Sequence, residues 1–130
     1  MVAEKVYPVE FDDNKGRAYI NLTGDISSIK IRNTFFAVSL NTNWSKGERS
    51  ILWYFKGACF LNSFEFAEIF KNADMVRDFA SPGKSAAVIE RDCQMQKDVA
   101  NFYSNIAKIF TERKIRHFNT SDEAETWLDS

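Results

Sequence analysis

The residues whose side chains could do chemistry gather in one stretch of the sequence, residues 58–65. It holds a thiol at Cys59 and a hydroxyl at Ser63, just before a segment with helical periodicity. A thiol near the N-terminus of a helix can be activated as a nucleophile or redox group. A hydroxyl there can carry a phosphate, because the helix dipole favours negative charge at that end.

Both residues also have a structural interpretation. Cys59 lies in an apolar run and suits a small buried hydrophobe. Asn62 is a good helix cap, and Glu65 three residues later completes a capping box, which would leave Ser63 as a solvated residue of the first turn. On these residues alone, both interpretations of Ser63 stay open.

No other motif supports catalysis or metal binding. The run Ser81-Pro82-Gly83-Lys84-Ser85 ends like a phosphate loop, but Asp78 stands where that motif needs a glycine. His117 has no cysteine or serine at an informative spacing. Cys59, Cys93 and His117 provide too few ligands for a zinc site. We therefore expect no enzyme, no metal and no cofactor.

The elements that must position this stretch follow from hydrophobic periodicity. Residues 51–55 form an almost unbroken apolar run, which predicts a buried strand leading into residues 58–65. Residues 13–16 form a turn cluster between two strand-like runs, which predicts a hairpin. The predicted strands cover residues 7–12, 17–22, 51–55, 85–90 and 114–118, and the predicted helices carry the apolar residues of 29–40, 66–80, 95–110 and 124–128.

The order of these elements predicts the fold class. After the hairpin, strands and helices alternate, which favours parallel strands joined by right-handed crossovers. Asp25 or Ser27 can cap the first helix, and Thr120 with Glu123 forms a capping box for the last one. We expect an α/β fold, with an N-terminal hairpin and a mixed, mostly parallel five-stranded sheet flanked by about four helices. Residues 58–65 would then lie at the carboxyl edge of the sheet, where such folds bind ligands.

Length, charge and composition limit the function classes. The 130 residues suit a single domain spanning 1–130. Seventeen basic and 18 acidic residues give a net charge of -1 without a charged run, so nucleic acid is not an expected partner. There is no signal-peptide pattern, and no apolar run approaches the ~18 residues of a membrane span. We expect a cytoplasmic protein with reduced cysteines and no transmembrane segment.

Aromatic residues are in excess, since they make up 15 % of the chain and 12 of them are phenylalanine. Some apolar residues fall off the main helical stripes or lie near the ends of predicted strands. They form a candidate apolar patch that consists of Trp44, Phe60, Phe64, Met75 and Phe79. These side chains either pack beneath neighbouring helices as ordinary core or, if exposed, mark a surface that contacts a partner or lipid.

Three stretches of the sequence resemble STAS domains, the SpoIIAA-like family of anti-sigma-factor antagonists. The run Ile20-Asn21-Leu22-Thr23-Gly24-Asp25-Ile26 is similar to the strand-to-helix turn of that family. The run Lys56-Gly57-Ala58-Cys59-Phe60-Leu61-Asn62-Ser63-Phe64-Glu65 follows its switch loop. Residues 118–128, from Phe118-Asn119-Thr120 to Thr126-Trp127-Leu128, resemble its C-terminal helix. The resemblance covers nearly the whole chain and implies a single STAS-like domain.

The resemblance also implies a site. Ser63 matches the phosphorylated serine of the family, and Asn62 stands in place of the preceding aspartate. Phe64 and Glu65 replace the second serine and the glycine. Glu65 would oppose a phosphate by about 1 kcal/mol across a solvated loop, so we expect Ser63 to be phosphorylated weakly or not at all. The candidate phosphosite and partner loop consists of Gly24, Asp25, Asn62, Ser63, Phe64 and Glu65.

These observations favour a small cytosolic STAS-like protein-binding or regulatory module that acts through residues 58–65. The alternative is a carrier of a small apolar ligand or lipid, because STAS-like sheets resemble the lipid-binding CRAL-TRIO architecture and the chain is rich in phenylalanine. The expected partner is a protein whose identity the sequence does not indicate. The oligomeric state stays open and includes a homodimer.

Overall fold

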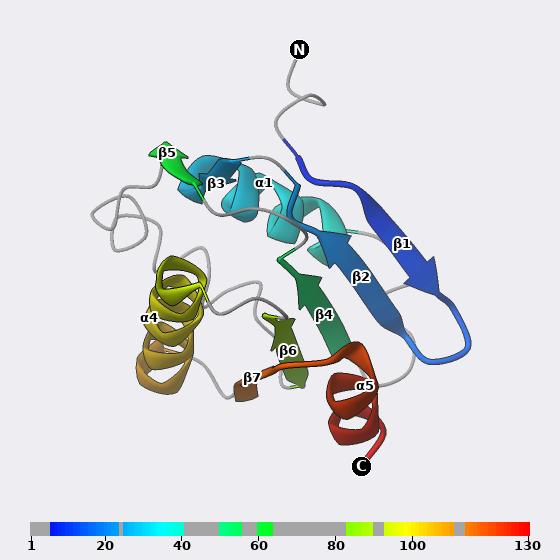
Figure 1. The fold of residues 1–130 in the computed structure, drawn as a ribbon. Helices are drawn as coiled ribbons and strands as arrows, with labels where there is room; N and C mark the ends of the chain where they lie inside the picture. The colour runs from blue at the N-terminus through cyan, green and yellow to red at the C-terminus, as the bar shows by residue number, and fades with distance from the viewer. Residues whose placement is uncertain are drawn as a thin grey trace.

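The computed structural model describes residues 6–23, 25–40, 50–55, 60–63, 83–89, 93–110 and 114–130. They form a five-stranded sheet with the order β1-β2-β4-β6-β7 and a separate two-stranded sheet of β3 and β5 (Figure 1). The strands are β1 (Val9–Asp12), β2 (Arg17–Asn21), β3 (Asp25–Ser27), β4 (Ser50–Tyr54), β5 (Phe60–Ser63), β6 (Lys84–Val88) and β7 (Lys114–Phe118). The helices are α1 (Ser28–Ser39), α4 (Gln94–Phe110) and α5 (Ser121–Asp129).

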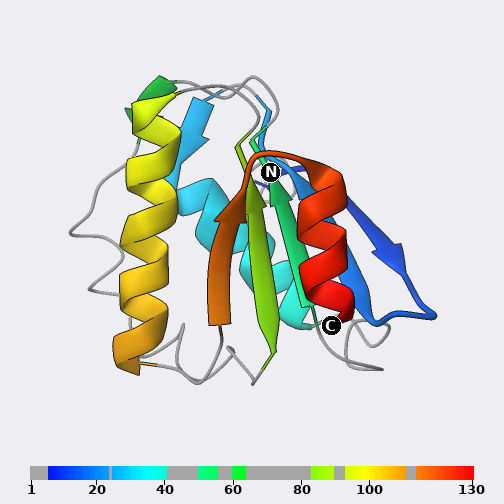
Figure 2. The same cartoon turned by 60° about the horizontal axis from the view of Figure 1, so that its bottom comes forward.

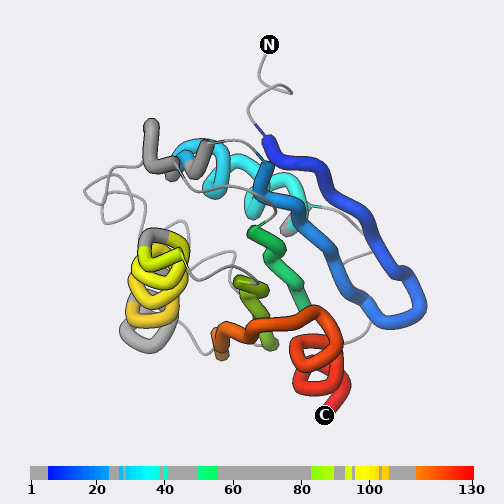
Figure 3. Tube along the Cα trace, viewed as in Figure 1, coloured from blue at the N-terminus to red at the C-terminus, as the bar shows by residue number. Residues whose placement is uncertain are grey.

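The predicted hairpin and mixed sheet are confirmed. β1 pairs with β2 antiparallel, and the pairs β2–β4, β4–β6 and β6–β7 are all parallel. The hairpin turn needs a left-handed residue, which Gly16 supplies with a φ of 60°. The Asp12 carboxylate accepts hydrogen bonds from the backbone N–H groups of Asn14 and Lys15, and these bonds hold the turn. The blue trace in Figure 3 follows this hairpin from β1 to β2.

The main sheet separates two cores because successive side chains of a strand point to opposite faces. In the central strand β4, Ile51 packs into one core and Leu52 into the other. The first core lies between the sheet and the helices α1 and α4, and the second lies under α5 on the other face (Figure 2). The first comprises Tyr7, Ala18, Ile20, Leu22, Ile31, Val38, Ile51, Phe55, Ala87, Ile89, Val99 and Ala100, and the second Leu52, Ala86, Val88, Ala124 and Leu128.

The helix starts agree with the capping signals in two places. Ser27 caps α1 by accepting a hydrogen bond from the Lys30 N–H at 3.3 Å, whereas Asp25, the other candidate cap, belongs to β3. Thr120 caps α5 by accepting one from the Glu123 N–H at 3.2 Å. Both caps satisfy a backbone donor that a helix start would otherwise leave open.

The described part of the chain holds three helices rather than the expected four. The helix predicted to carry the apolar residues of 66–80 lies outside the described residues. Its predicted start is wrong, because Asn62 and Ser63 belong to the strand β5. The segment that holds them pairs with β3, with Ser63 opposite Ser27, and such pairing overrides a local capping preference. None of the helices in the described ranges is long and apolar enough to cross a membrane.

We predict that the second core can be tested with two leucines at helix ends. Leu128 is 0 % exposed, and Leu40, just after α1, is 62 % exposed. Leu128→Ala should lower the free energy of unfolding by about 2–5 kcal/mol, because it leaves a cavity. Leu40→Ala, the control, should change it by less than about 0.5 kcal/mol. Urea denaturation measures both, and equal losses would contradict the assignment of this core.

Candidate functional site

Two of the stretches predicted to form a site meet in the two-stranded sheet. β3 follows β2 and β5 follows β4, and both lie beyond the carboxyl ends of those strands (Figure 2). β3 and β5 run parallel, with Asp25 opposite Phe60 and Ser27 opposite Ser63. The structure therefore brings the backbone of Asp25 next to the segment that holds Asn62 and Ser63.

The order of strands in the main sheet explains why β3 pairs with β5. The Leu22 N–H donates to the Tyr54 carbonyl at 2.8 Å, which extends the pairing of β2 with β4 by one step. The two chain segments thus leave the sheet as neighbours. Because they leave side by side, a few residues suffice for them to pair again as β3 and β5.

A buried tyrosine fixes the junction between β3 and α1. The Ser27 N–H donates to the Tyr7 hydroxyl at 3.0 Å, and the Tyr7 N–H donates to the Thr34 hydroxyl at 2.8 Å. Thr34 in turn donates to the Lys30 carbonyl inside α1 at 2.6 Å. Tyr7 is 1 % exposed, so these bonds are shielded from water. The first turn of α1 is therefore held in place relative to β3.

Two features at the start of α1 favour a negatively charged group at this junction. The first turn of α1 has no acidic residue, and its N-terminus carries the positive end of the helix dipole. The Lys30 ammonium lies 4.5 Å from the centroid of the Tyr7 ring, a cation–π contact that keeps its charge near the helix start. A negatively charged group beside Ser27 would be favoured there.

Several predicted site residues lie outside the described residues. These are Gly24, Phe64 and Glu65 of the partner loop, Trp44, Met75 and Phe79 of the apolar patch, and Cys59. Phe60 is described as part of β5. Cys93 is a half-buried free thiol just before α4, and His117 is exposed on β7. Among the residues that are described, no group of three or more His, Cys, Asp or Glu side chains could hold a metal ion.

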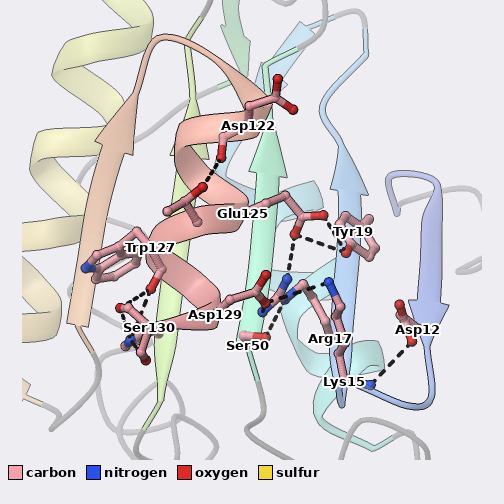
Figure 4. A network of polar contacts seen from close by, with 12 residues as sticks. Asp12, Lys15, Arg17, Tyr19, Ser50, Asp122, Glu125, Trp127, Asp129 and Ser130 are labelled. Carbon is pink, nitrogen blue, oxygen red and sulfur yellow. Dashed lines mark hydrogen bonds and ion pairs between the residues drawn. The ribbon is translucent and has the colours of Figure 1, made fainter.

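A polar network that the sequence analysis did not predict joins α5 to the amino ends of β2 and β4 (Figure 4). We call it the Arg17 network. Arg17 is 1 % exposed, and its Nε donates to Ser50 Oγ at 2.8 Å. Its other two nitrogens donate to Glu125 Oε1 and, at 2.9 Å, to Asp129 Oδ1. The Arg17 guanidinium is therefore paired with groups of the same chain.

Neighbouring groups complete the Arg17 network. The Tyr19 hydroxyl donates to the Glu125 carboxylate at 3.1 Å, and burial raises the pKa of Tyr19. The hydrogen bond from Arg17 lowers the pKa of Asp129 below its ordinary value of 3.8. Lys15 lies 3.7 Å from the same carboxylate. These contacts hold a helix on a sheet, so we assign them a structural role.

The sequence did contain a signal for this network. Glu125 and Asp129 are four residues apart, so they lie on one face of α5. Arg17 and Tyr19 alternate along β2, so they lie on one face of the sheet. What the sequence could not show is that these two faces meet.

The comparisons with known proteins do not identify a family. Neither protein-family models, nor curated proteins, nor solved structures gave a match to this chain. The STAS resemblance therefore stays a prediction, and the site is argued from its own geometry.

We predict that Arg17→Met lowers the free energy of unfolding by about 2–4 kcal/mol, because two carboxylates and a buried hydroxyl lose their hydrogen bonds from the guanidinium. Arg32 in α1 is the control, since it is half-buried and its guanidinium bonds to the neighbouring Asn33 side chain at 3.4 Å. Arg32→Met should cost less than about 1 kcal/mol. Chemical denaturation at neutral pH gives both values. A loss at Arg17 no larger than that at Arg32 would show that α5 does not depend on the network.

The lowered pKa of Asp129 predicts an acid dependence of stability. A carboxyl whose folded-state pKa lies below its unfolded-state pKa stabilises the protein above the unfolded value, and the contribution disappears as the pH falls through the folded value. Stability should therefore decrease below about pH 4. Asp129→Asn should flatten the decrease, as measured by urea midpoints between neutral pH and acid. An unchanged profile in this variant would contradict the assignment.

Proposed function

We propose that this protein is a small protein-binding or regulatory module that docks a partner protein on the β3–β5 pair. The observation that carries the proposal is the parallel pairing of β3 with β5, which sets Asp25 opposite Phe60 and Ser27 opposite Ser63. It joins the two stretches that resemble the strand-to-helix turn and the switch loop of STAS domains. A resemblance in two distant stretches has more weight when those stretches are neighbours in space.

The backbone of this pair supports docking. Within the described ranges, β3 and β5 pair only with each other. A two-stranded sheet is marginal by itself, and its outer edges carry backbone donors and acceptors, of which the Ser27 N–H already donates to the Tyr7 hydroxyl. An extended segment of a partner can add to such an edge by backbone hydrogen bonds. The N-terminal part of α1 then lies beside the docked segment.

Side chains in the first turn of α1 also support docking of a partner. Ile29 is 41 % exposed although it is a large aliphatic side chain, and it follows Ser27 by two residues. Lys30 supplies a positive charge next to it. An apolar contact flanked by polar groups is typical of a protein interface.

Docking as proposed here does not require phosphorylation of Ser63. Its register partner Ser27 caps α1, so the helix dipole would favour a phosphate near Ser63. Glu65 two residues later would oppose it, as expected from the sequence. The carrier of an apolar ligand or lipid stays a prediction, since its candidate residues other than Phe60 lie outside the described residues.

A photo-crosslinking amino acid at position 63 tests the proposal in cells that express the protein. We expect one protein adduct from position 63. The control is position 14, because Asn14 is exposed in the hairpin turn at the amino end of β2, whereas the β3–β5 pair lies beyond the carboxyl end of that strand. The same adduct from both positions, or none from position 63, would contradict the proposal. The intact mass of the recovered protein shows whether Ser63 carries phosphate, and we expect little or none.

The affinity of the partner identified in this way then tests the surface itself. Ile29→Glu should weaken binding by about tenfold or more, because it places a charge in the apolar part of the interface. Leu40→Glu is the matched control at the other end of α1 and should change the affinity by less than about twofold. Equal effects of the two variants would place the partner elsewhere.

A further inference from the structure

Three positively charged side chains gather on one face of β6 and β7, beside α5. Lys84 and Lys114 are register partners on these neighbouring strands, and Arg116 lies two residues beyond Lys114. Neighbouring strands are about 4.8 Å apart, and alternate residues of one strand are about 6.6 Å apart on the same face. Lys114 and Arg116 are exposed. We call this cluster, together with Trp127, the basic surface.

The indole of Trp127 lies between two of these cations. The Lys84 ammonium is 5.3 Å and the Arg116 guanidinium carbon 5.6 Å from the centroid of the ring. The Phe118 ring is 5.6 Å from the same indole, centroid to centroid. Trp127 is half-buried, so part of the ring faces solvent within the positive cluster. The basic surface therefore combines charge with an exposed aromatic face.

Lys84 is already bound, because its ammonium donates to the carbonyls of Trp127 and Ser130 at 3.1 and 2.7 Å. The carboxylates of α5 do not neutralise the other two cations, Lys114 and Arg116. Glu125 and Asp129 lie on the β2 side of the helix, where they bind Arg17, whereas Trp127 lies on the β7 side (Figure 4). Glu123 accepts a hydrogen bond from the Thr120 hydroxyl at 3.0 Å. The ion pairs found among the described residues involve neither Lys114 nor Arg116. Two exposed positive charges thus face outward beside an aromatic ring.

From this arrangement we propose that the basic surface binds an extended acidic segment of a partner protein. In such a segment, alternate side chains point to one side at intervals of about 6.6 Å, which matches the spacing of Lys114 and Arg116. Carboxylates at alternate positions would face these two cations, and an apolar side chain would pack on Trp127. The basic surface lies on the α5 face of the sheet, so this docking site is separate from the β3–β5 pair.

The charge argues for a peptide rather than a nucleic acid or a membrane. The whole chain has a net charge of -1, so it lacks the broad positive field that attracts extended polyanions. Nucleic-acid binding commonly uses about 6–10 phosphate contacts, and lipid recognition uses clusters of roughly 4–8 basic residues. A short acidic segment needs only local charge complementarity.

A fluorescein-labelled peptide of alternating glutamate and leucine tests the proposal by fluorescence anisotropy. We expect saturable binding at about 50 mM salt that weakens strongly at about 500 mM, because exposed charge pairs are screened. The same peptide with lysine in place of glutamate should not bind. No saturation with the glutamate peptide, or equal binding of the lysine peptide, would overturn the proposal.

Charge-reversal variants test whether the peptide binds at the basic surface. Arg116→Glu should weaken peptide binding by about tenfold, and Lys114→Glu is a second variant with the same expectation. The matched control is Lys97→Glu on α4, on the other face of the sheet, with less than about a twofold effect. Circular dichroism confirms that each variant is folded. An equal loss in Lys97→Glu would overturn the proposal, and so would tighter binding of anionic vesicles or single-stranded DNA than of the peptide.

Discussion

A buried positive charge determines how the amino edge of the sheet is built. The Arg17 guanidinium is 1 % exposed, and a charge so far from water is tolerated only when hydrogen-bonded and paired. Its partners are Ser50 on the neighbouring strand and the carboxylates of Glu125 and Asp129 on α5. The apolar side chains that α5 buries fully are Ala124 and Leu128. The position of this helix therefore depends on polar contacts as much as on apolar packing.

The two ends of the parallel strands consequently serve different purposes. At the amino end, the Glu125 and Asp129 carboxylates of α5 pair with Arg17, so this end stabilises the fold. At the carboxyl end, β3 and β5 continue beyond the sheet and lie next to the start of α1. Because α5 uses its carboxylates on the β2 side, Lys114 and Arg116 of β7 stay exposed on its other side. Because these regions are separate, partners at the two proposed docking surfaces would not disturb the Arg17 network.

Much of the architecture could be predicted from local patterns. The hairpin around Gly16, a buried strand at β4, the strand Lys114–Phe118 and the cap at Thr120 were all predicted and are confirmed. The failure at Asn62 and Ser63 has a physical cause. The side chains of both residues favour the start of a helix, but the segment that holds them pairs with the strand β3 instead. Local preference of this kind is weak compared with sheet pairing.

The sequence alone determined the type of most described elements, since periodicity, turn glycines and caps act within a few residues; the short strands β3 and β5 are the exceptions. The tertiary structure decided which elements meet. Arg17 and Glu125 are 108 positions apart, and their contact depends on the register of the sheet and the placement of α5. The same holds for Asp25 beside Phe60, and for Trp127 between Lys84 and Arg116. No local pattern encodes these distances, because they are set by the packing of whole faces against one another.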